Sequence, residues 1–274
     1  MIVMPRCKRN IVKAGTYHIM VRGVNKQDIF YDDKDKEMFV RLLYYYKKKL
    51  ECKIHAYCLM PNHVHILFKD KEELISDFMR NIASVYAYEF NQKHKRVGHL
   101  FQDRFKSIYV YNDEYLLRLI RYIHRNPEKA GICKTEEYKW SSYTEYLYNN
   151  NIIEKDFILE KFDKNKNIAL KNFIKFVNDK DEEELDELYL KEKLTDKEAI
   201  ELIKRITKLE NLSNIKKYNK KEKEKILYKI LKINNIKESQ IARILGMSKN
   251  FKSRMGKKGP DPFFPENDKI LQII

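Results

Sequence analysis

Two histidines and one tyrosine are the residues of this sequence whose types and spacing could support phosphate chemistry. His63 and His65 are separated by one residue in a predicted strand, so both imidazoles project from the same face. Two neighbouring neutral imidazoles can share a divalent metal ion. An isolated His-x-His pair of this kind more often has a structural role, so the spacing leaves both a metal site and a structural role open.

Tyr122 and Asn126 form the second element, because they lie four residues apart in a predicted helix. This spacing places a hydroxyl one turn before an amide, on one flank of the helix's apolar stripe. The alternative is that Tyr122 is an aromatic residue at the boundary of the core. His124 falls on the other side of this helix and is predicted to be structural.

The elements that must position these residues follow from hydrophobic periodicity and turn residues. The pattern predicts four strands and three helices in the first half of the chain, and the last helix is expected to stop before Pro127. This order predicts an α+β fold, a small antiparallel sheet with helices on one face, followed by an all-α C-terminal region. The predicted strands are 16–22, 52–60, 63–68 and 105–111, and the predicted helices are 33–50, 72–91 and 112–126.

Composition and charge indicate a globular protein with a polyanionic partner. Of 274 residues, 43% are hydrophobic and 35% charged, which argues against disorder. No apolar run approaches a membrane span, and the four cysteines form no CxxC pair, so a reduced cytoplasmic protein is expected. The net charge is +16: residues 1–147 carry 27 Lys and Arg against 18 acids, residues 148–220 carry 16 of each, and residues 221–274 carry 13 against 6. Two basic blocks separated by a neutral one favour two surfaces for nucleic acid.

The second basic block has a helix-turn-helix pattern. Ser239 is the expected N-cap of its first helix, and Gly246 lies where the turn requires a positive φ. A recognition helix would begin at Ser248. Lys252 occupies a position that is usually apolar, so Phe251 would have to supply the packing. The alternative is a basic helical hairpin without sequence specificity. The candidate DNA contacts are Lys249, Asn250, Lys252 and Arg254.

Five ordered motifs over residues 10–147 resemble a known family. They are Tyr57-Cys-Leu-Met-Pro-Asn-His-Val-His-Ile-Leu67, Gly98-His-Leu-Phe-Gln-Asp-Arg-Phe-Lys-Ser107, Tyr115-Leu-Leu, Arg121-Tyr-Ile-His-Arg-Asn-Pro127 and Trp140-Ser-Ser-Tyr143. Together they resemble the single-tyrosine transposases with a His-hydrophobic-His metal motif, in particular the REP-associated tyrosine transposase group. Any one motif alone would be weak.

The resemblance implies a ferredoxin-like domain that cuts and rejoins single-stranded or hairpin DNA. Carried over by position, His63 and His65 are ligands of Mg²⁺ or Mn²⁺, Tyr122 is the nucleophile, and Asn126 is the candidate third ligand. Gln is common at that last position in the family, and Asn is shorter. The expected intermediate is a 5′-phosphotyrosine. Monomer and homodimer both remain open, and no membrane partner is expected. The candidate phosphate contacts are Arg104 and the helix residues Arg118, Arg121 and Arg125.

The sequence therefore predicts a transposase or single-strand endonuclease with an appended DNA-binding region. One alternative is a catalytically silent regulator that binds hairpin DNA. Another is a metal phosphodiesterase that uses water, with Tyr122 structural. The expected domains are a catalytic domain (1–147), a helical spacer (148–220), a helix-turn-helix region (221–258) and a tail (259–274).

Overall fold

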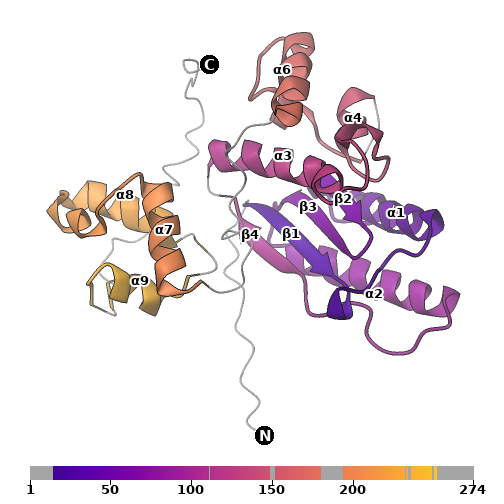
Figure 1. Ribbon diagram of the computed structural model, residues 1–274, viewed down its shortest axis with the longest axis horizontal. Helices are drawn as coiled ribbons and strands as arrows, with labels where there is room; N and C mark the ends of the chain where they lie inside the picture. The colour runs from indigo at the N-terminus through magenta and orange to yellow at the C-terminus, as the bar shows by residue number, and fades with distance from the viewer. Residues whose placement is uncertain are drawn as a thin grey trace, which may run out of the picture. The chain divides into compact units, whose positions relative to one another are not determined.

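A computed structural model describes residues 15–110, 112–148, 152–179, 194–231, 233, 236–248 and 250–251. The chain divides into two compact units, Met1–Leu185 and Asp186–Ile274 (Figure 1). Within the described ranges, no helix has the length and apolar character that crossing a membrane requires.

The first unit is built on a four-stranded antiparallel sheet with the strand order β2-β3-β1-β4. The strands β1 and β3 are interior, so each is hydrogen-bonded on both sides. The α+β class and the four predicted strands are confirmed. The strands are β1 (Thr16–Arg22), β2 (Lys53–Met60), β3 (His63–Lys69) and β4 (Lys106–Tyr109). The helices of this unit are α1 (Asp33–Lys49), α2 (Ile75–Lys93), α3 (Asp113–Lys129), α4 (Tyr143–Leu147), α5 (Asp156–Leu159) and α6 (Lys166–Asn178), with short 3-10 turns at Val24–Lys26 and Thr135–Glu137.

The pairing register separates an apolar face of the sheet from a polar one. Arg22 lies opposite His63, and Met20 lies opposite His65. Directly paired residues share a face, so these side chains point to one side of the sheet. The residues that alternate with them along each strand, such as Ile19 and Ile66, point to the other side and are fully buried. The alternation in the sequence therefore assigns both predicted metal ligands to the polar face.

Helices cover both faces of the sheet, which differs from the predicted arrangement on one face. On the apolar face, α2 packs through Phe78 against Phe68 of β3, with ring centroids 4.8 Å apart. On the polar face, α3 brings Tyr122 against His65, with ring centroids 5.4 Å apart. The physical reason is that the amphipathic α3 buries its own apolar stripe on the face that carries the histidines (Figure 1).

The helix α3 begins where the sequence predicts and ends later. Its N-cap Asn112 accepts a hydrogen bond from the backbone N–H of Tyr115 at 2.7 Å. The predicted stop before Pro127 is wrong, because the helix continues to Lys129 with Pro127 buried inside it. A proline removes one N–H donor, and the next turn still closes through the bond from Ala130 N to Asn126 O.

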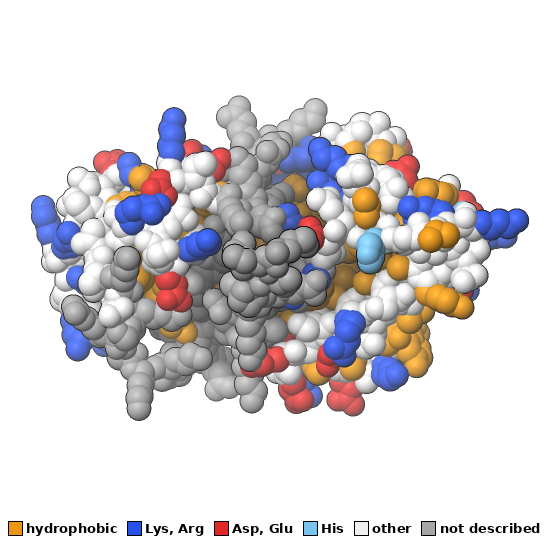
Figure 2. All heavy atoms as spheres, turned by 90° about the horizontal axis from the view of Figure 1, so that it is seen from below, with side chains coloured by type: hydrophobic (Ala, Val, Ile, Leu, Met, Phe, Trp, Pro, Cys, Tyr) orange, Lys and Arg blue, Asp and Glu red, His pale blue; other side chains and the backbone are white. Residues whose placement is uncertain are grey.

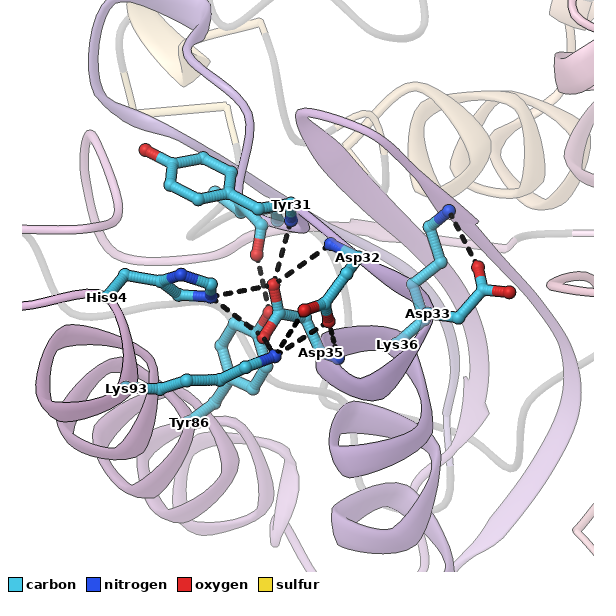
Figure 3. Close-up of polar contacts among 9 residues, drawn as sticks. Tyr31, Asp32, Asp33, Asp35, Lys36, Tyr86, Lys93 and His94 are labelled. Atoms are coloured by element: carbon cyan, nitrogen blue, oxygen red, sulfur yellow. Dashed lines mark hydrogen bonds and ion pairs between the residues drawn. The ribbon is translucent and has the colours of Figure 1, made fainter.

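A buried carboxylate joins the start of α1 to the end of α2 (Figure 3). Asp32 and Asp35 form a capping box at the start of α1. The fully buried Asp35 also lies 2.7 Å from Lys93 Nζ and 3.0 Å from His94 Nε2, and its oxygen accepts from the Tyr31 backbone N–H at 2.8 Å. These contacts pair the buried Asp35 carboxylate with a cation and satisfy it with hydrogen bonds. The carboxylate therefore fixes α1 and α2, the two helices that cover the apolar face.

The Trp140–Tyr143 motif protects the edge of the sheet. Leu59 N donates to Trp140 O, and Ser142 N donates to Tyr57 O, both at 2.9 Å. Ser142 Oγ also lies 2.9 Å from His124 Nε2, so the same serine connects β2 to α3. This motif therefore covers an edge strand that would otherwise expose unpaired backbone groups.

The helices after residue 148 do not form a separate spacer. In α6, Phe173 stacks on Tyr146 of α4 with ring centroids 4.2 Å apart, so this helix packs on the first unit. The next helix, α7 (Asp196–Thr207), belongs to the second unit. The division therefore differs from the expected 148–220 spacer, because apolar residues before residue 180 and after residue 193 pack into two different cores.

The second unit is a helical bundle around its own apolar core. It contains α7, a 3-10 turn at Leu212–Lys217, α8 (Lys220–Leu231) and α9 (Glu238–Ile244). The positive φ of Gly246 and the burial of Phe251 match the expected turn and packing. The predicted N-cap Ser239 is wrong, since α9 starts at Glu238 after the N-cap Lys237. The core joins α7 to α8 and α9, so the C-terminal region begins well before residue 221.

Candidate active site

Three histidines and Tyr122 gather between the sheet and α3. His63 and His65 have ring centroids 4.8 Å apart, which places the predicted metal pair together. Tyr122 lies edge-on to His65 at 5.4 Å and to His18 of β1 at 6.2 Å. No local sequence pattern identifies His18. Its place in the site follows only from the pairing of β1 with β3, because the two strands lie far apart in the chain.

Each histidine of the predicted metal pair has its Nδ1 atom engaged. His63 Nδ1 lies 2.6 Å from Asn62 Oδ1, and His65 Nδ1 lies 2.8 Å from His18 Nε2. His65 Nε2 is buried and has no hydrogen-bond partner among the described residues. A buried ring nitrogen without a partner is the kind of atom that a metal ion satisfies.

Burial keeps these imidazoles neutral. It is the largest cause lowering the pKa of His63 to about 4, with a further contribution from the nearby Arg22 cation and an opposing hydrogen bond with Asn126. Burial also lowers the pKa of His18 to about 3 and holds the pKa of His65 well below its ordinary value. Imidazoles that are neutral at pH 7 have a lone pair available for a cation.

Asn126 lies next to the metal pair, as its helical position predicts. Its side chain hydrogen-bonds with the His63 ring, and its Nδ2 donates to Tyr122 O at 2.7 Å. The second bond orients the amide toward the metal pair. The shorter Asn therefore reaches the His63 ring from α3.

The donor set fits an open site for Mg²⁺ or Mn²⁺. In the described part of the chain, no three His, Cys, Asp or Glu side chains converge as a closed metal site would require. Two imidazoles and one amide oxygen would leave positions for phosphate oxygens and water, and these donors leave the cation its full charge. The orphaned His65 Nε2 supports this fit.

The family comparison agrees with this geometry. Residues 11–126 match the family model described as "Transposase IS200 like". Over these residues the chain is therefore similar to the IS200-like transposases. The match ends at Asn126, and it includes all the candidate metal ligands and Tyr122.

Comparison with solved structures adds a structural likeness. This chain is similar to a solved structure of a REP-associated tyrosine transposase bound to a REP hairpin, with 20% sequence identity and a TM-score of 0.46. The likeness covers 55% of this chain and 91% of that one. No curated protein matches the sequence.

Two cations of the first unit lie close to the site. Arg22 is exposed at the end of β1, directly opposite His63. Lys129 at the end of α3 has its Nζ 5.7 Å from the centroid of the Tyr122 ring. Neither residue was identified from the sequence, because only the strand register and the extension of α3 past Pro127 place them here. Both positions suit a phosphate approaching Tyr122.

The predicted arginine contacts divide into two groups. Arg104 is exposed, and Arg118 is partly exposed and lies 2.9 Å from Glu114. Arg121 and Arg125, the other two candidate phosphate contacts, instead lie against α6. The Arg121 guanidinium lies 3.8 Å from the Phe176 ring centroid, and Arg125 donates to Asp179 O at 3.0 Å. These two arginines hold α6 against α3.

Most of the C-terminal DNA-contact predictions lie outside the described residues. This applies to Lys249, Lys252 and Arg254. Asn250 is described and exposed. Arg243 of α9 lies 2.6 Å from Asp196 of α7, so its charge is paired inside the second unit.

His124 has a structural role that predicts acid sensitivity. It is fully buried, and burial lowers its pKa from 6.5 to about 3. Between these values the unfolded chain binds a proton that the folded chain does not, so the free energy of unfolding falls by up to about 1.4 kcal/mol per pH unit as pH decreases. In His124→Gln, the loss of stability between pH 7.5 and pH 5 should be smaller than in the natural protein by about 2 kcal/mol. Urea unfolding of both proteins at the two pH values measures this, and equal losses would contradict it.

Proposed function

We propose that this protein cuts and rejoins single-stranded or hairpin DNA through covalent attachment of the DNA to Tyr122. The observation that carries the proposal is the position of Tyr122 beside His65, whose buried Nε2 has no hydrogen-bond partner in the part of the chain that the structure describes. An aromatic hydroxyl beside open metal-ligand atoms is what phosphoryl transfer to a tyrosine requires. The match of residues 11–126 to the IS200-like transposase family model supports the same reaction class.

The proposed reaction has two balanced steps. In the first, the Tyr122 oxygen bonds to phosphorus, the bond from phosphorus to the 3′ oxygen breaks, and the tyrosine proton is lost as the leaving oxygen gains one. In the second, a 3′-OH attacks the phosphotyrosine and releases Tyr122, so the bond energy is conserved and no nucleotide cofactor is consumed.

The chain's own residues have separate parts in these steps. His63, His65 and Asn126 would hold Mg²⁺ or Mn²⁺, which when bound polarises a non-bridging phosphate oxygen. Asn126 Nδ2 also donates to the Tyr122 carbonyl oxygen. This bond would hold the proposed ligand Asn126 at a fixed position relative to the proposed nucleophile Tyr122. Arg22 and Lys129 are placed to attract the phosphate. His124 is bonded to Ser142 and takes no part.

Trapping of a protein–DNA adduct tests the proposed function. Hairpin DNA labelled at its 5′ or its 3′ end is incubated with the protein and Mn²⁺, and the products are separated under denaturing conditions. The expected adduct carries the 3′ fragment through its 5′ phosphate. Cleavage without an adduct would favour a phosphodiesterase that uses water, and binding without cleavage would favour a silent regulator.

We also propose that the second unit contributes DNA affinity without chemistry. Lysine and arginine side chains are spread over the face of this unit seen in Figure 2, and the segment 249–258 that follows α9 in the sequence is basic. A second contact on the same DNA becomes effectively intramolecular and raises avidity. Sequence-independent phosphate contacts would account for such a distributed basic surface.

Deletion of residues 186–274 should separate affinity from cleavage. The first unit retains its own core, so it should still cut a short hairpin at saturating DNA. Its affinity for hairpins with flanking duplex should fall, and the slope of log affinity against log salt should become shallower as phosphate contacts are lost. Fluorescence anisotropy over a salt series measures both. Unchanged affinity and slope would contradict a DNA-binding role and favour a protein partner for this unit.

A further inference from the structure

We propose that His18 is a positioning residue that accepts the Nδ1–H of His65 and thereby presents the unprotonated Nε2 of His65 to the metal ion. This inference rests on the metal role of His65 in the proposed function. His18 belongs to β1, and none of the motifs that carry the family resemblance includes it.

The contact between His18 and His65 is close and fully enclosed. His18 Nε2 lies 2.8 Å from His65 Nδ1, and the two rings stack with centroids 5.0 Å apart and planes 20° from parallel. Each residue is 1% exposed, so water does not compete for the hydrogen bond. Both strands are interior to the sheet, which fixes the separation of the two rings.

The contact allows only two proton arrangements between neutral rings. If His65 donates, its Nδ1 carries the proton and its Nε2 has a free lone pair. If His18 donates, His65 must carry its proton on Nε2, where it blocks a metal ion. His18 Nδ1 and His65 Nε2 are both buried, and neither has a hydrogen-bond partner among the described residues. A cation at His65 Nε2 therefore selects the first arrangement.

His63 gives an internal comparison. Its Nδ1 lies 2.6 Å from Asn62 Oδ1, and an amide oxygen can only accept a hydrogen bond. His63 must therefore carry its proton on Nδ1 and has its lone pair on Nε2. The same arrangement at His65 gives both ligands the same tautomer. Asn62 and His18 then have equivalent roles, as neutral acceptors that add no negative charge beside the metal ion.

The position of His18 also involves the nucleophile. Its ring lies edge-on to Tyr122 with centroids 6.2 Å apart, on the same side as the His65 ring. A side chain that fills this space without an acceptor would preserve the packing and lose the tautomer control. This separates a positioning role from a purely structural one.

Mn²⁺ binding to the full-length protein, followed by the EPR signal of the free ion, tests the inference without measuring activity. His18→Leu should weaken Mn²⁺ binding about 10–100-fold, the range found when the outer hydrogen-bond partner of a ligand is lost. His18→Gln supplies an amide oxygen as acceptor and should restore most of the affinity. His55→Gln removes another buried histidine, bonded to Glu154 O away from the site, and should leave Mn²⁺ binding unchanged.

NMR of the ¹⁵N-labelled natural protein with Mg²⁺ gives a second measurement that needs no variant. We expect His65 to be protonated on Nδ1 and not on Nε2. Each of three results would overturn the inference. The first is a proton on His65 Nε2, and the second is unchanged Mn²⁺ affinity in a folded His18→Leu variant. The third is that replacing His65 does not change Mn²⁺ binding. Metal binding without any DNA adduct would overturn the proposed function alone.

Discussion

Tyr122→Phe should abolish the covalent protein–DNA adduct while DNA binding persists. The substitution removes only the hydroxyl that we assign as nucleophile, and the ring that packs edge-on against His65 remains. Loss of a nucleophile that forms a covalent intermediate typically lowers turnover by several powers of ten, so we expect at least about a 1,000-fold decrease in adduct formation. Denaturing gels with end-labelled hairpin DNA measure the adduct, and a mobility-shift assay measures binding.

Tyr115→Phe is the matched control for this experiment. Tyr115 lies on the same helix, but it is only 3% exposed, so its hydroxyl is not available to DNA. This variant should form the adduct at the natural rate. If Tyr122→Phe retained the adduct and Tyr115→Phe lost it, the nucleophile assignment would be wrong. If cleavage continued in Tyr122→Phe without any adduct, water would be the nucleophile.

Replacing either His63 or His65 with Ala should abolish cleavage and weaken Mn²⁺ binding by more than about 100-fold, since loss of an outer hydrogen-bond partner alone costs about 10–100-fold. The reason is that the two rings, with centroids 4.8 Å apart, are the two nitrogen ligands that we propose for the metal ion. Isothermal titration with Mn²⁺ measures the affinity, and thermal unfolding measures whether each variant folds.

His99→Ala controls for weak metal binding by surface imidazoles. His99 is exposed in the loop before β4, so its loss should change neither Mn²⁺ affinity nor cleavage. Addition of EDTA to the natural protein tests the same role without a substitution. Full cleavage in EDTA would refute metal assistance, whatever the variants show.

The parts of the site that the sequence could predict depend on short-range periodicity. The period of two in a strand places His63 and His65 on one face, and the helical spacing places Asn126 one turn after Tyr122. Both arguments require only neighbouring residues. The strand and helix order of the first unit was predictable for the same reason. The structure places Tyr122 and Asn126 against the pair, as the motif resemblance implies.

The parts that could not be predicted depend on contacts between distant segments. His18 meets His65 only through the register of β1 with β3, which no local pattern specifies. Arg121 and Arg125 look like exposed cations until α6 covers them. Periodicity also does not indicate that α3 covers the second face of the sheet, because an amphipathic helix fits either face.

The interior positions of β1 and β3 determine which part of the first unit can open without dismantling the site. A strand that is hydrogen-bonded on both sides exchanges its amide hydrogens only in large opening events, whereas an edge strand frays at much lower cost. The histidine strands are both interior, and the edge strand β4 is four residues long and follows the loop that contains Arg104. In the proposed reaction, DNA entry and product release can therefore use the low-energy fluctuations of the β4 edge, while the sheet face that carries the histidines stays assembled.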